Sequence, residues 1–245
     1  MVVDLFIPCF IDQVAPEIGF SMLKVLEKLG CEVNYNPQQT CCGQPGFNAG
    51  YTREAGQVAQ KWLADFQSVA QSEEHYIVAP SASCVGMVRN NYESLLTAQQ
   101  SLKLYYQLQK KTFEITEFIV DVLGVNEIPD VQFPHKVTYH DACSALRECG
   151  ISAAPRQLLK SIVGLELIEL PQQTTCCGFG GTFSVKFQGI STAMADQKVQ
   201  NVLATQAEYV VSTDYSCLMH LEAYSQKTGK FVRFMHIADV LASGW

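Results

Sequence analysis

The triplet Cys-Cys-Gly occurs twice in this chain, at residues 41–43 and 176–178, and a threonine precedes it each time. Ten cysteines and 16 glycines in 245 residues would supply roughly 0.03 such triplets by chance, so the repetition needs a cause. Each triplet also has one cysteine 32 or 33 positions before it and another 40 or 42 positions after it. Equivalent cysteines lie 133 to 135 positions apart, a spread that ordinary loop insertions produce. An internal duplication therefore accounts for eight of the ten cysteines, namely Cys9, Cys41, Cys42, Cys84, Cys143, Cys176, Cys177 and Cys217.

The duplication predicts two domains of similar size. We expect a first cysteine-rich domain over residues 1–124 and a second over residues 134–245, with the proline-containing stretch 125–134 as the linker. The first half carries about 15 extra residues near 97–111. Each half is long enough to bury a core, and a composition that is 48% hydrophobic and 17% charged is typical of a compact globular protein.

The net charge of −7 argues against nucleic acid or an anionic membrane as the main partner, because both attract basic patches. The N-terminus has an early acid and no basic segment, and no uncharged apolar run approaches the ~18 residues of a membrane helix. We therefore expect a cytoplasmic protein without direct membrane insertion. In that compartment, cysteines serve as metal ligands or redox groups more often than as disulfides.

Strands alternate with amphipathic helices, which predicts the fold class α/β with two tandem, internally duplicated, Rossmann-like domains built on parallel sheets. Strands are expected at residues 2–8, 32–35, 75–79, 113–115, 136–140, 165–170, 209–212 and 231–233. Helices are expected at residues 16–29, 52–69, 155–162 and 185–203, directly after Cys84 and Cys217, and at the end of each half around residues 121–123 and 239–241. Each cysteine of the duplicated sets then follows the carboxyl end of a strand, so each set converges on one edge of a sheet.

Four thiols at one edge of a sheet are compatible with disulfides, a zinc site, an exchange-active dithiol or an iron–sulfur cluster. Sequence-adjacent cysteines serve a single tetrahedral ion poorly, whereas they can ligate different irons of one cluster. The glycine behind each pair lets the backbone approach closely and leaves N–H groups free to point at sulfur. The flanking cysteines precede helices, whose N-terminal ends favour thiolate. The spacing therefore favours a cluster over zinc.

The doubled Cys…Cys-Cys-Gly…Cys pattern resembles the cysteine-rich domain family found in heterodisulfide reductase B subunits and in the iron–sulfur subunit of glycolate oxidase. With two such domains and nothing else, the chain is most similar to the lactate-utilisation branch of that family. The resemblance implies an iron–sulfur subunit of a cytoplasmic three-protein system that oxidises L-lactate, a small hydroxy acid, to pyruvate. It also implies a ferredoxin-like iron–sulfur partner subunit and a third lactate-utilisation subunit.

The chain departs from the fuller family motif, which ends in Cys-x-x-Cys. Ser81 and Asp214 stand where the first cysteine of that pair would be. The departure disfavours the five-thiolate cluster of the reductase and favours one [4Fe–4S] cluster in each half, held by the eight duplicated cysteines as metal and cofactor ligands. Zinc is the adventitious or alternative metal. Ser81 and Asp214 both precede a helix, so we expect them to be capping residues, with oxygen ligation as the weaker alternative.

A few further residues are candidates for chemistry. His140 and Asp141 lie just before Cys143, where they are a possible catalytic acid–base pair, although core packing and capping explain them equally well. Cys31 and Cys149 fall outside the repeat and are expected to be non-ligands. Residues 178–182 lack the acidic strand end of a dinucleotide site, so we reject nucleotide binding there. Three cations could each meet a substrate carboxylate but are expected to be solvated surface charges: Arg89, Arg147 and Lys186.

Two rival functions remain open from the sequence. One is a zinc-bound or cluster-free scaffold that assembles partner subunits, and the other is a thiol/disulfide redox subunit like that of heterodisulfide reductase. Protein purified without oxygen should be brown if it holds iron–sulfur clusters and colourless if it is a zinc protein or a bare scaffold. Oxidation of a hydroxy acid normally needs a hydride acceptor such as flavin, and no fingerprint for one is found, so we expect no lactate turnover by this chain alone.

Overall fold

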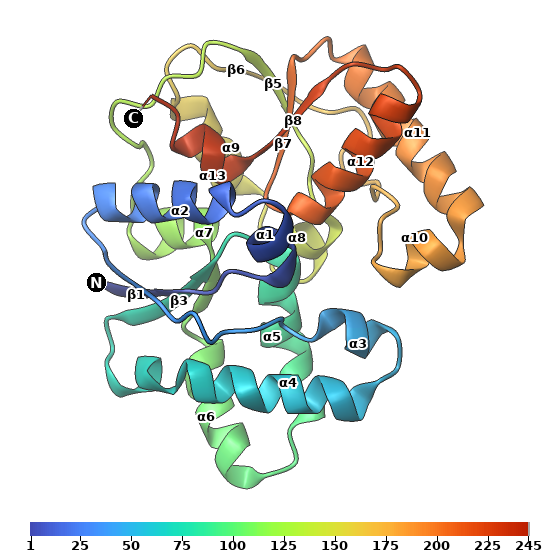
Figure 1. The fold of residues 1–245 in the computed structure, drawn as a ribbon. Coiled ribbons are helices and arrows are strands. Elements are labelled where there is room, and N and C mark those ends of the chain that lie inside the picture. Colours follow the sequence, from blue (N-terminus) through green and yellow to red (C-terminus); the bar gives the residue numbers. More distant parts are fainter. Residues whose placement is uncertain (245) are drawn as a thin grey trace. The chain divides into compact units, whose positions relative to one another are not determined.

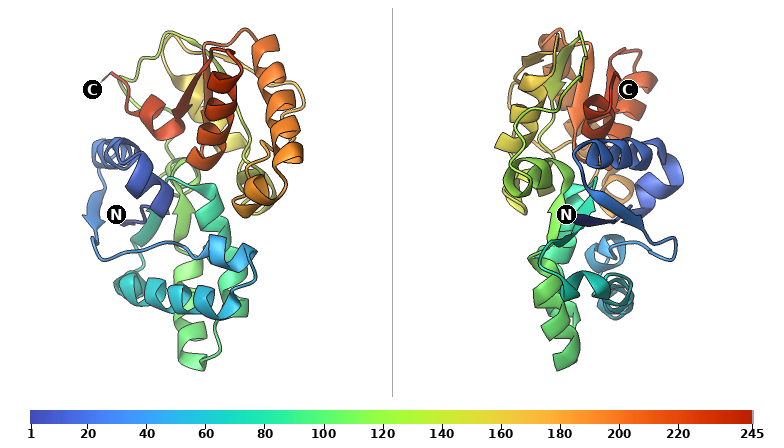
Figure 2. Two further views of the ribbon diagram at one scale, coloured as in Figure 1. Left: turned by 45° about the vertical axis from the view of Figure 1, so that its right-hand side comes forward. Right: turned by 90° about the vertical axis from the view of Figure 1, so that its left-hand side faces the viewer.

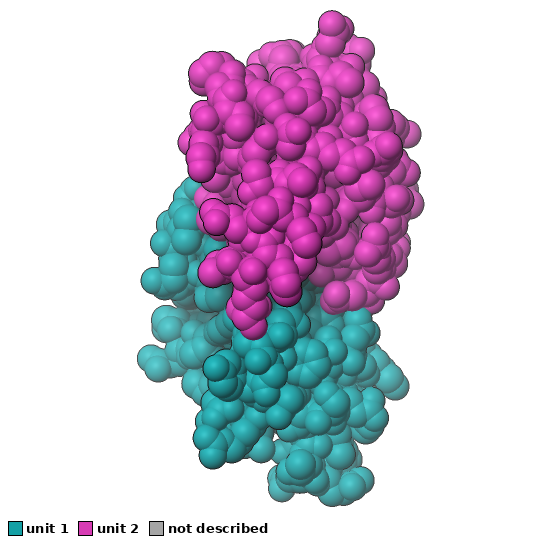
Figure 3. All heavy atoms as spheres, turned by 90° about the vertical axis from the view of Figure 1, so that its right-hand side faces the viewer, with its two compact units in different colours: residues 1–118 teal, residues 119–245 magenta. Residues whose placement is uncertain are grey.

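The computed structural model describes residues 1–244 (Figure 1, with two further views in Figure 2). The chain divides into two compact units, which we call unit 1 (residues 1–118) and unit 2 (residues 119–245) (Figure 3). Each unit contains a four-stranded, all-parallel sheet with helices in the connections. The predicted duplicated α/β fold is therefore confirmed. The ranges 1–124 and 134–245 stay predictions of the limits of independently folding domains.

The sheet of unit 1 has the strand order β2-β1-β3-β4. In register, Val2 of β1 lies between Glu32 of β2 and His75 of β3. The edge strand β2 is mostly exposed, while β3 ends in buried apolar residues, as a central strand covered on both faces requires. The strand bounds are β1 Val2–Leu5, β2 Glu32–Tyr35, β3 His75–Ala79 and β4 Thr112–Glu114.

The helices of unit 1 bury apolar stripes. In α2, Ile18, Met22, Val25 and Leu26 are buried at helical spacing. The helices are α1 Cys9–Val14, α2 Glu17–Lys28, α3 Gln44–Asn48, α4 Thr52–Asp65, α5 Ala82–Leu95, α6 Gln99–Gln109 and α7 Ile115–Glu117, with a 3-10 helix η1 at Gln67–Gln71. A π-helix η2 at Phe118–Val122 spans the boundary between the two units.

Unit 2 repeats the strand order as β6-β5-β7-β8. Its strands are β5 Lys136–Tyr139, β6 Glu166–Ile168, β7 Tyr209–Ser212 and β8 Arg233–His236. Its helices are α8 Cys143–Arg147, α9 Ala153–Ser161, α10 Thr182–Lys186, α11 Gln188–Ala204, α12 Tyr215–Lys227 and α13 Ile237–Leu241. Helices α11 and α12 lie side by side, as Figure 2 shows.

Some predicted elements differ from the structure. The helix expected over residues 52–69 ends at Asp65, because buried Phe66 leaves helical geometry to pack against Phe6. The helix expected over residues 185–203 is broken at Phe187 into α10 and α11. Several helices were not expected at all, among them α1, α3, α6 and α8, whereas the helices expected around residues 121–123 and 239–241 correspond to η2 and α13. The extra residues of the first half form α6, for which unit 2 has no counterpart among its described helices.

The stretch 125–134 was predicted to be a linker, but it packs into unit 2. Ile128, Val131 and Phe133 are all buried. Gln132 forms a parallel bridge with Val163, which follows α9. The apolar residues of this stretch therefore belong to the core of unit 2. In the described part of the chain, none of the helices has both the length and the apolar composition that crossing a membrane requires.

Candidate metal centres

The first cysteine set gathers at the carboxyl edge of the sheet in unit 1. Cys9 is the first residue of α1, the triplet lies between β2 and α3, and Cys84 is in the first turn of α5. The Sγ atoms of Cys9 and Cys41 are 3.6 Å apart, and those of Cys42 and Cys84 are 3.4 Å apart. Cys41 and Cys42 also share a hydrogen bond. The four thiols therefore form one continuous group, buried at Cys42 and Cys84 and partly exposed at the other two.

The second set repeats this arrangement in unit 2. Cys143 is the first residue of α8, and Cys217 is in the first turn of α12. The Sγ atoms of Cys177 and Cys217 are 3.2 Å apart, and Cys176 shares hydrogen bonds with Cys143 and Cys177. Burial again falls on the second residue of the triplet and on the last cysteine of the set. None of the ten cysteines forms a disulfide. The structure thus brings each predicted set of four together, and metal binding by these sets stays a prediction.

The glycine of each triplet adopts a left-handed backbone conformation. The φ angle is 83° at Gly43 and 93° at Gly178. This turn lets the N–H of Gly43 donate to the Sγ atom of Cys41 at 3.3 Å and the N–H of Gly178 donate to that of Cys176 at 3.4 Å. Backbone donors aimed at sulfur stabilise thiolates and clusters, so the local fold favours negative charge at both triplets.

A side-chain hydroxyl fixes each triplet loop. In unit 1, the Tyr92 hydroxyl donates to the carbonyl oxygen of Cys42 at 2.9 Å. In unit 2, the Ser191 hydroxyl donates to the carbonyl oxygen of Gly178 at 2.8 Å. Both donors are buried on helices, α5 and α11 respectively, so the loops are held by the rigid part of each unit.

In each set, the first cysteine of the triplet is the anionic one. Hydrogen bonds, chiefly from Cys42, lower the pKa of Cys41 to about 3, and hydrogen bonds, chiefly from Cys143, lower the pKa of Cys176 to about 2. The same hydrogen bonds raise the pKa of Cys42 and of Cys143. Each set therefore presents one ready thiolate, which is the protonation state that a metal ligand needs.

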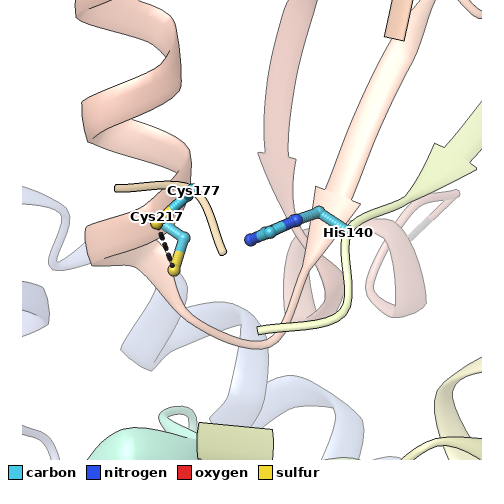
Figure 4. Close-up of side chains that lie close together, drawn as sticks. All are labelled: His140, Cys177 and Cys217. Carbon is cyan, nitrogen blue, oxygen red and sulfur yellow. Dashed lines mark hydrogen bonds between the residues drawn. The ribbon is translucent and has the colours of Figure 1, made fainter. Parts of the chain in front are cut away.

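His140 lies beside the second set (Figure 4). Its side chain is fully buried, and its ring points toward Cys177 and Cys217, with the ligand atoms of the three residues within 4.8 Å of one another. Neither ring nitrogen has a hydrogen-bond partner among the described residues. Burial, and then the charge of Lys198, lower the pKa of His140 to about 3, so the imidazole is neutral at pH 7.

Asp141 has different neighbours. Its carboxylate is 3% exposed, and the Arg156 guanidinium donates to both of its oxygens at 2.8 and 2.7 Å. Arg156 belongs to α9 and also pairs with Glu169 at 2.9 Å. Asp141 is therefore held in an ion pair. A joint acid–base role for His140 and Asp141 stays a prediction.

Ser81 and Asp214, which stand where the fuller motif has a cysteine, differ in whether they cap a helix. Ser81 is the N-cap of α5, and its hydroxyl accepts from the N–H of Cys84 at 3.4 Å, as expected. Asp214 precedes α12, but its side chain makes no capping hydrogen bond, so the capping prediction is wrong for Asp214. Its carboxylate is buried instead near Cys143, where its charge adds to the effects of Cys176 and burial in raising the pKa of that thiol.

The two remaining cysteines lie outside both sets. Cys31 is buried directly before β2, at the amino end of that strand and therefore at the sheet edge opposite the site. Cys149 follows the C-terminal end of α8, where its N–H donates to the carbonyl oxygen of Ser144. Their absence from metal binding stays a prediction.

The expectation of a solvated charge is wrong for Arg89. Its side chain is 17% exposed and makes two hydrogen bonds to Glu117 at 3.0 and 2.8 Å, and a third to the carbonyl oxygen of Thr112. Arg89 therefore ties α5 to β4 and α7. Arg147 and Lys186 are exposed, as expected.

Sequence reasoning missed Lys198. Its side chain is fully buried beside the second site, and its ammonium donates to the carbonyl oxygens of Gln172 and Gln173 at 3.2 Å each. The available signal was its position, because it falls on the buried face of α11 that is defined at helical spacing by Ser191, Ala195, Val199 and Val202.

The residues present fit a thiolate-bound metal group in both units. Each unit offers four sulfur donors, one of them already anionic, and backbone N–H groups aimed at sulfur. Soft thiolate donors select iron–sulfur clusters or zinc. In unit 2 the buried, unpartnered ring of His140 adds a nitrogen donor.

Comparisons with known proteins agree with this arrangement. A family model described as a cysteine-rich domain, CCG, matches residues 3–89 and 137–222. Lactate utilization protein A from Exiguobacterium sp. is 42% identical over 243 residues, covering 99% of this chain and 97% of the relative. Lactate utilization protein A from Bacillus velezensis is also 42% identical, covering 99% of this chain and all of the relative (100%).

The fold is also found among solved structures. An example is the crystal structure of a hypothetical protein from Helicobacter pylori, with a TM-score of 0.65 and 12% sequence identity. The match covers 98% of this chain and 48% of that one. With the cysteine-rich domain matched in both units and full-length relatives at this level of identity, this chain belongs to the lactate utilization protein A family of cysteine-rich domain proteins.

Proposed function

We propose that this chain is the iron–sulfur subunit of a cytoplasmic multi-protein system that oxidises L-lactate to pyruvate, with one four-thiolate [4Fe–4S] cluster in each unit. The observation that carries the proposal is the duplicated group of four thiols at the carboxyl edge of each sheet. The relatives named for lactate utilization, which match over nearly their whole length, support the substrate.

The arrangement of the thiols supports a cluster over a single ion. Both cysteines of each triplet lie in the sulfur group, and adjacent cysteines suit a cluster because they can ligate different irons. Bound there, the clusters would transfer electrons one at a time. The chain itself supplies the thiolates, the backbone donors to sulfur and the burial that limits solvent access.

The electron count of the reaction matches two clusters in one chain. Oxidation of lactate to pyruvate releases two electrons and two protons, and each cluster carries one electron. The electrons then pass to a ferredoxin-like iron–sulfur partner subunit, and a third lactate-utilisation subunit completes the system. This division of labour makes the isolated chain a carrier that needs its partners for turnover.

The test begins with metal analysis of protein that has been reconstituted anaerobically with iron and sulfide. We expect about eight irons and eight acid-labile sulfides per chain, from two [4Fe–4S] clusters. Lactate-dependent dye reduction should be negligible for the chain alone and appear when its partner subunits are added. Colourless protein without sulfide, or full turnover by the isolated chain, contradicts the proposal.

One observation favours a second candidate, a zinc-bound scaffold. The ligand atoms of His140, Cys177 and Cys217 lie within 4.8 Å of one another, which suits a single ion in unit 2. Metal analysis separates the two candidates, because a scaffold would hold zinc without sulfide. It would also support assembly of the partner subunits without changing its absorption spectrum when dithionite is added.

A further inference from the structure

The two sites differ in the residue that lies behind the sulfurs. Phe6 in unit 1 and His140 in unit 2 occupy equivalent positions, three residues before the first cysteine of their sets. The N–H of Phe6 donates to the carbonyl oxygen of Val78 at 2.9 Å, and the N–H of His140 donates to that of Val211 at 2.8 Å. Val78 and Val211 are both in the strand that leads to the last cysteine, so the backbone frame is the same in both units.

The side chain of Phe6 has aromatic neighbours, whereas that of His140 has a charged one. Phe6 packs edge-on against Trp62, with ring centroids 5.9 Å apart, and against Phe66. Trp62 lies four residues after Val58, which a Cβ atom added at Gly43 would meet, and Lys198 lies four residues after Met194, which a Cβ atom added at Gly178 would meet. An aromatic pair in unit 1 is therefore replaced by His140 and Lys198 in unit 2.

The ring of His140 lacks any protein partner for its two nitrogens. The side chain is fully buried, and both nitrogens are without a hydrogen bond in the described part of the chain. A buried polar group without a partner destabilises the folded state, because it has lost its hydrogen bonds to water and gained none in return. Apolar Phe6 fills the same position in unit 1 at no such cost, so the imidazole in unit 2 needs a partner that is not a protein atom.

The atoms nearest to the imidazole ring indicate that this partner is a metal. The ring points at the sulfurs of Cys177 and Cys217, and the ligand atoms of all three lie within 4.8 Å of one another (Figure 4). The ammonium of Lys198 bonds to two backbone carbonyl oxygens, so it leaves the imidazole nitrogens unoccupied. Imidazole nitrogen is a common metal ligand beside thiolate.

We propose that His140 is a nitrogen ligand of the metal centre in unit 2, whereas thiolates alone hold the centre in unit 1. The proposal rests on the proposed function only in requiring that unit 2 binds a metal. The imidazole would take the place of one thiolate of the second set, so this centre carries less negative charge than a four-thiolate cluster and has a higher reduction potential. The centre in unit 2 is then the first of the two to accept an electron.

The experiment isolates each centre in the full chain. The variant Cys42→Ala removes a ligand of unit 1, so its spectra report on unit 2, and Cys177→Ala does the reverse. Each variant is labelled with ¹⁵N-histidine, reconstituted anaerobically with iron and sulfide, and reduced for pulsed electron paramagnetic resonance. We expect the strong hyperfine coupling of a directly bound histidine nitrogen in Cys42→Ala and none in Cys177→Ala.

Substitutions of histidine then assign the coupling. His140→Phe, which copies Phe6 of unit 1, should abolish it in the Cys42→Ala background and lower the midpoint potential of the remaining centre. His220→Gln is the matched control, because His220 is another histidine near the second triplet, although only half-buried, and the coupling should persist in that variant. Circular dichroism confirms that the variants are folded.

Two results would overturn the proposal. One is iron bound in unit 2 with no nitrogen coupling or only the weak coupling of a hydrogen bond. The other is a coupling that survives His140→Phe. If the chain takes up zinc and no iron, the proposed function fails but ligation is still decided. X-ray absorption at the zinc edge of Cys42→Ala should then show a nitrogen scatterer at about 2.0 Å that disappears in His140→Phe, and its absence from Cys42→Ala would contradict ligation.

Discussion

Gly178 occupies a position that has no room for a side chain. A Cβ atom there would lie 2.7 Å from the backbone oxygen of Ser191 and 2.9 Å from the Cβ atom of Met194, and the φ angle of 93° is strained for any other residue. The second triplet can therefore pack against α11 only because its third residue is glycine.

We predict that Gly178→Ala destabilises the metal-free protein by about 2–4 kcal/mol, from backbone strain plus displacement of α11. Gly189→Ala is the control, because Gly189 lies inside α11 with nothing within 4 Å of its added Cβ atom. That change should be neutral or stabilising by up to about 1 kcal/mol. Urea unfolding followed by circular dichroism measures both, and equal midpoints for the two variants would contradict the prediction.

Glu114 is a fully buried carboxyl at the N-terminal end of α7. One of its oxygens accepts from the N–H groups of Thr116 and Glu117, while the other has no partner among the described residues. Burial raises the pKa of Glu114 to about 8 from an ordinary value near 4.5. The folded state therefore holds a proton that the unfolded state releases between these two pH values.

This linkage fixes the sign of a pH effect. The contribution of Glu114 to stability is fully present below about pH 4.5 and is lost as the pH rises to about 8, with a slope of at most about 1.4 kcal/mol per pH unit. Glu114→Gln should remove that part of the pH dependence. Trp62, which is buried in unit 1, reports unfolding by fluorescence in a Trp245→Phe background. Parallel stability curves for the two proteins between pH 5 and 8 would count against a raised pKa.

Sequence patterns predicted the cysteine sets because spacing alone reveals a duplication. The buried charges of Arg89, Arg156 and Lys198 were not predicted in their contacts, because a sequence shows the type of a side chain but not its partner. Only Lys198 could have been predicted to be buried, from its position on the buried face of α11. The neighbours of His140 were likewise not predicted, because Cys177 and Cys217 are distant in the sequence and only the folded sheet brings them close to it.

Helix α9 is tied to the loops that follow β5 and β6 by one side chain. Arg156 binds Asp141 after β5 and Glu169 after β6, and its side chain is 14% exposed. Because Asp141 is almost fully buried, loss of Arg156 leaves an uncompensated charge inside unit 2.

Arg156→Met is expected to destabilise the protein by about 3–5 kcal/mol, the usual cost of removing one partner of a buried ion pair. The second change Asp141→Asn should restore part of that loss because it removes the stranded charge. Arg53→Met is the control, since the Arg53–Glu54 pair is exposed and contributes little. Denaturant unfolding measures the free energy of unfolding of each variant. If Arg156→Met lowers it no more than Arg53→Met does, the ion pair does not hold α9.

Elements with long periodic patterns were predictable, and short ones were not. Strand β7 matches its expected bounds because the apolar run Tyr209-Val210-Val211 marks it. Helices α1 and α8 have only six and five residues, which is too short for a 3.6-residue period to be recognised. The breaks at Phe66 and Phe187 were missed because the apolar pattern continues through them. Phe66 is fully buried and packs against Phe6, whereas Phe187 is 53% exposed and its ring lies against that of Phe183, four residues earlier.

At the scale of the whole molecule, each unit carries its own complete set of cysteines. We predict that Cys42→Ala and Cys177→Ala each lower the bound iron to about half, and that each change weakens only its own unit, because metal binding is coupled to folding. Cys31→Ala is the control and should keep full iron. Iron analysis together with limited proteolysis tests this. Full iron in both variants and loss of iron in Cys31→Ala would refute the ligand assignment.

The division of the strands also sets an order of assembly. Strands β1 to β4 and the first cysteine set all lie within residues 1–118, and β5 to β8 and the second set follow. During synthesis on the ribosome, the first set is therefore complete before Cys143 has been made. Because domains fold as units from the N-terminus, the first set of thiols can be enclosed in its own unit while the second is still being translated. Translation thereby keeps apart two groups of reactive sulfur that would otherwise be free to cross-link.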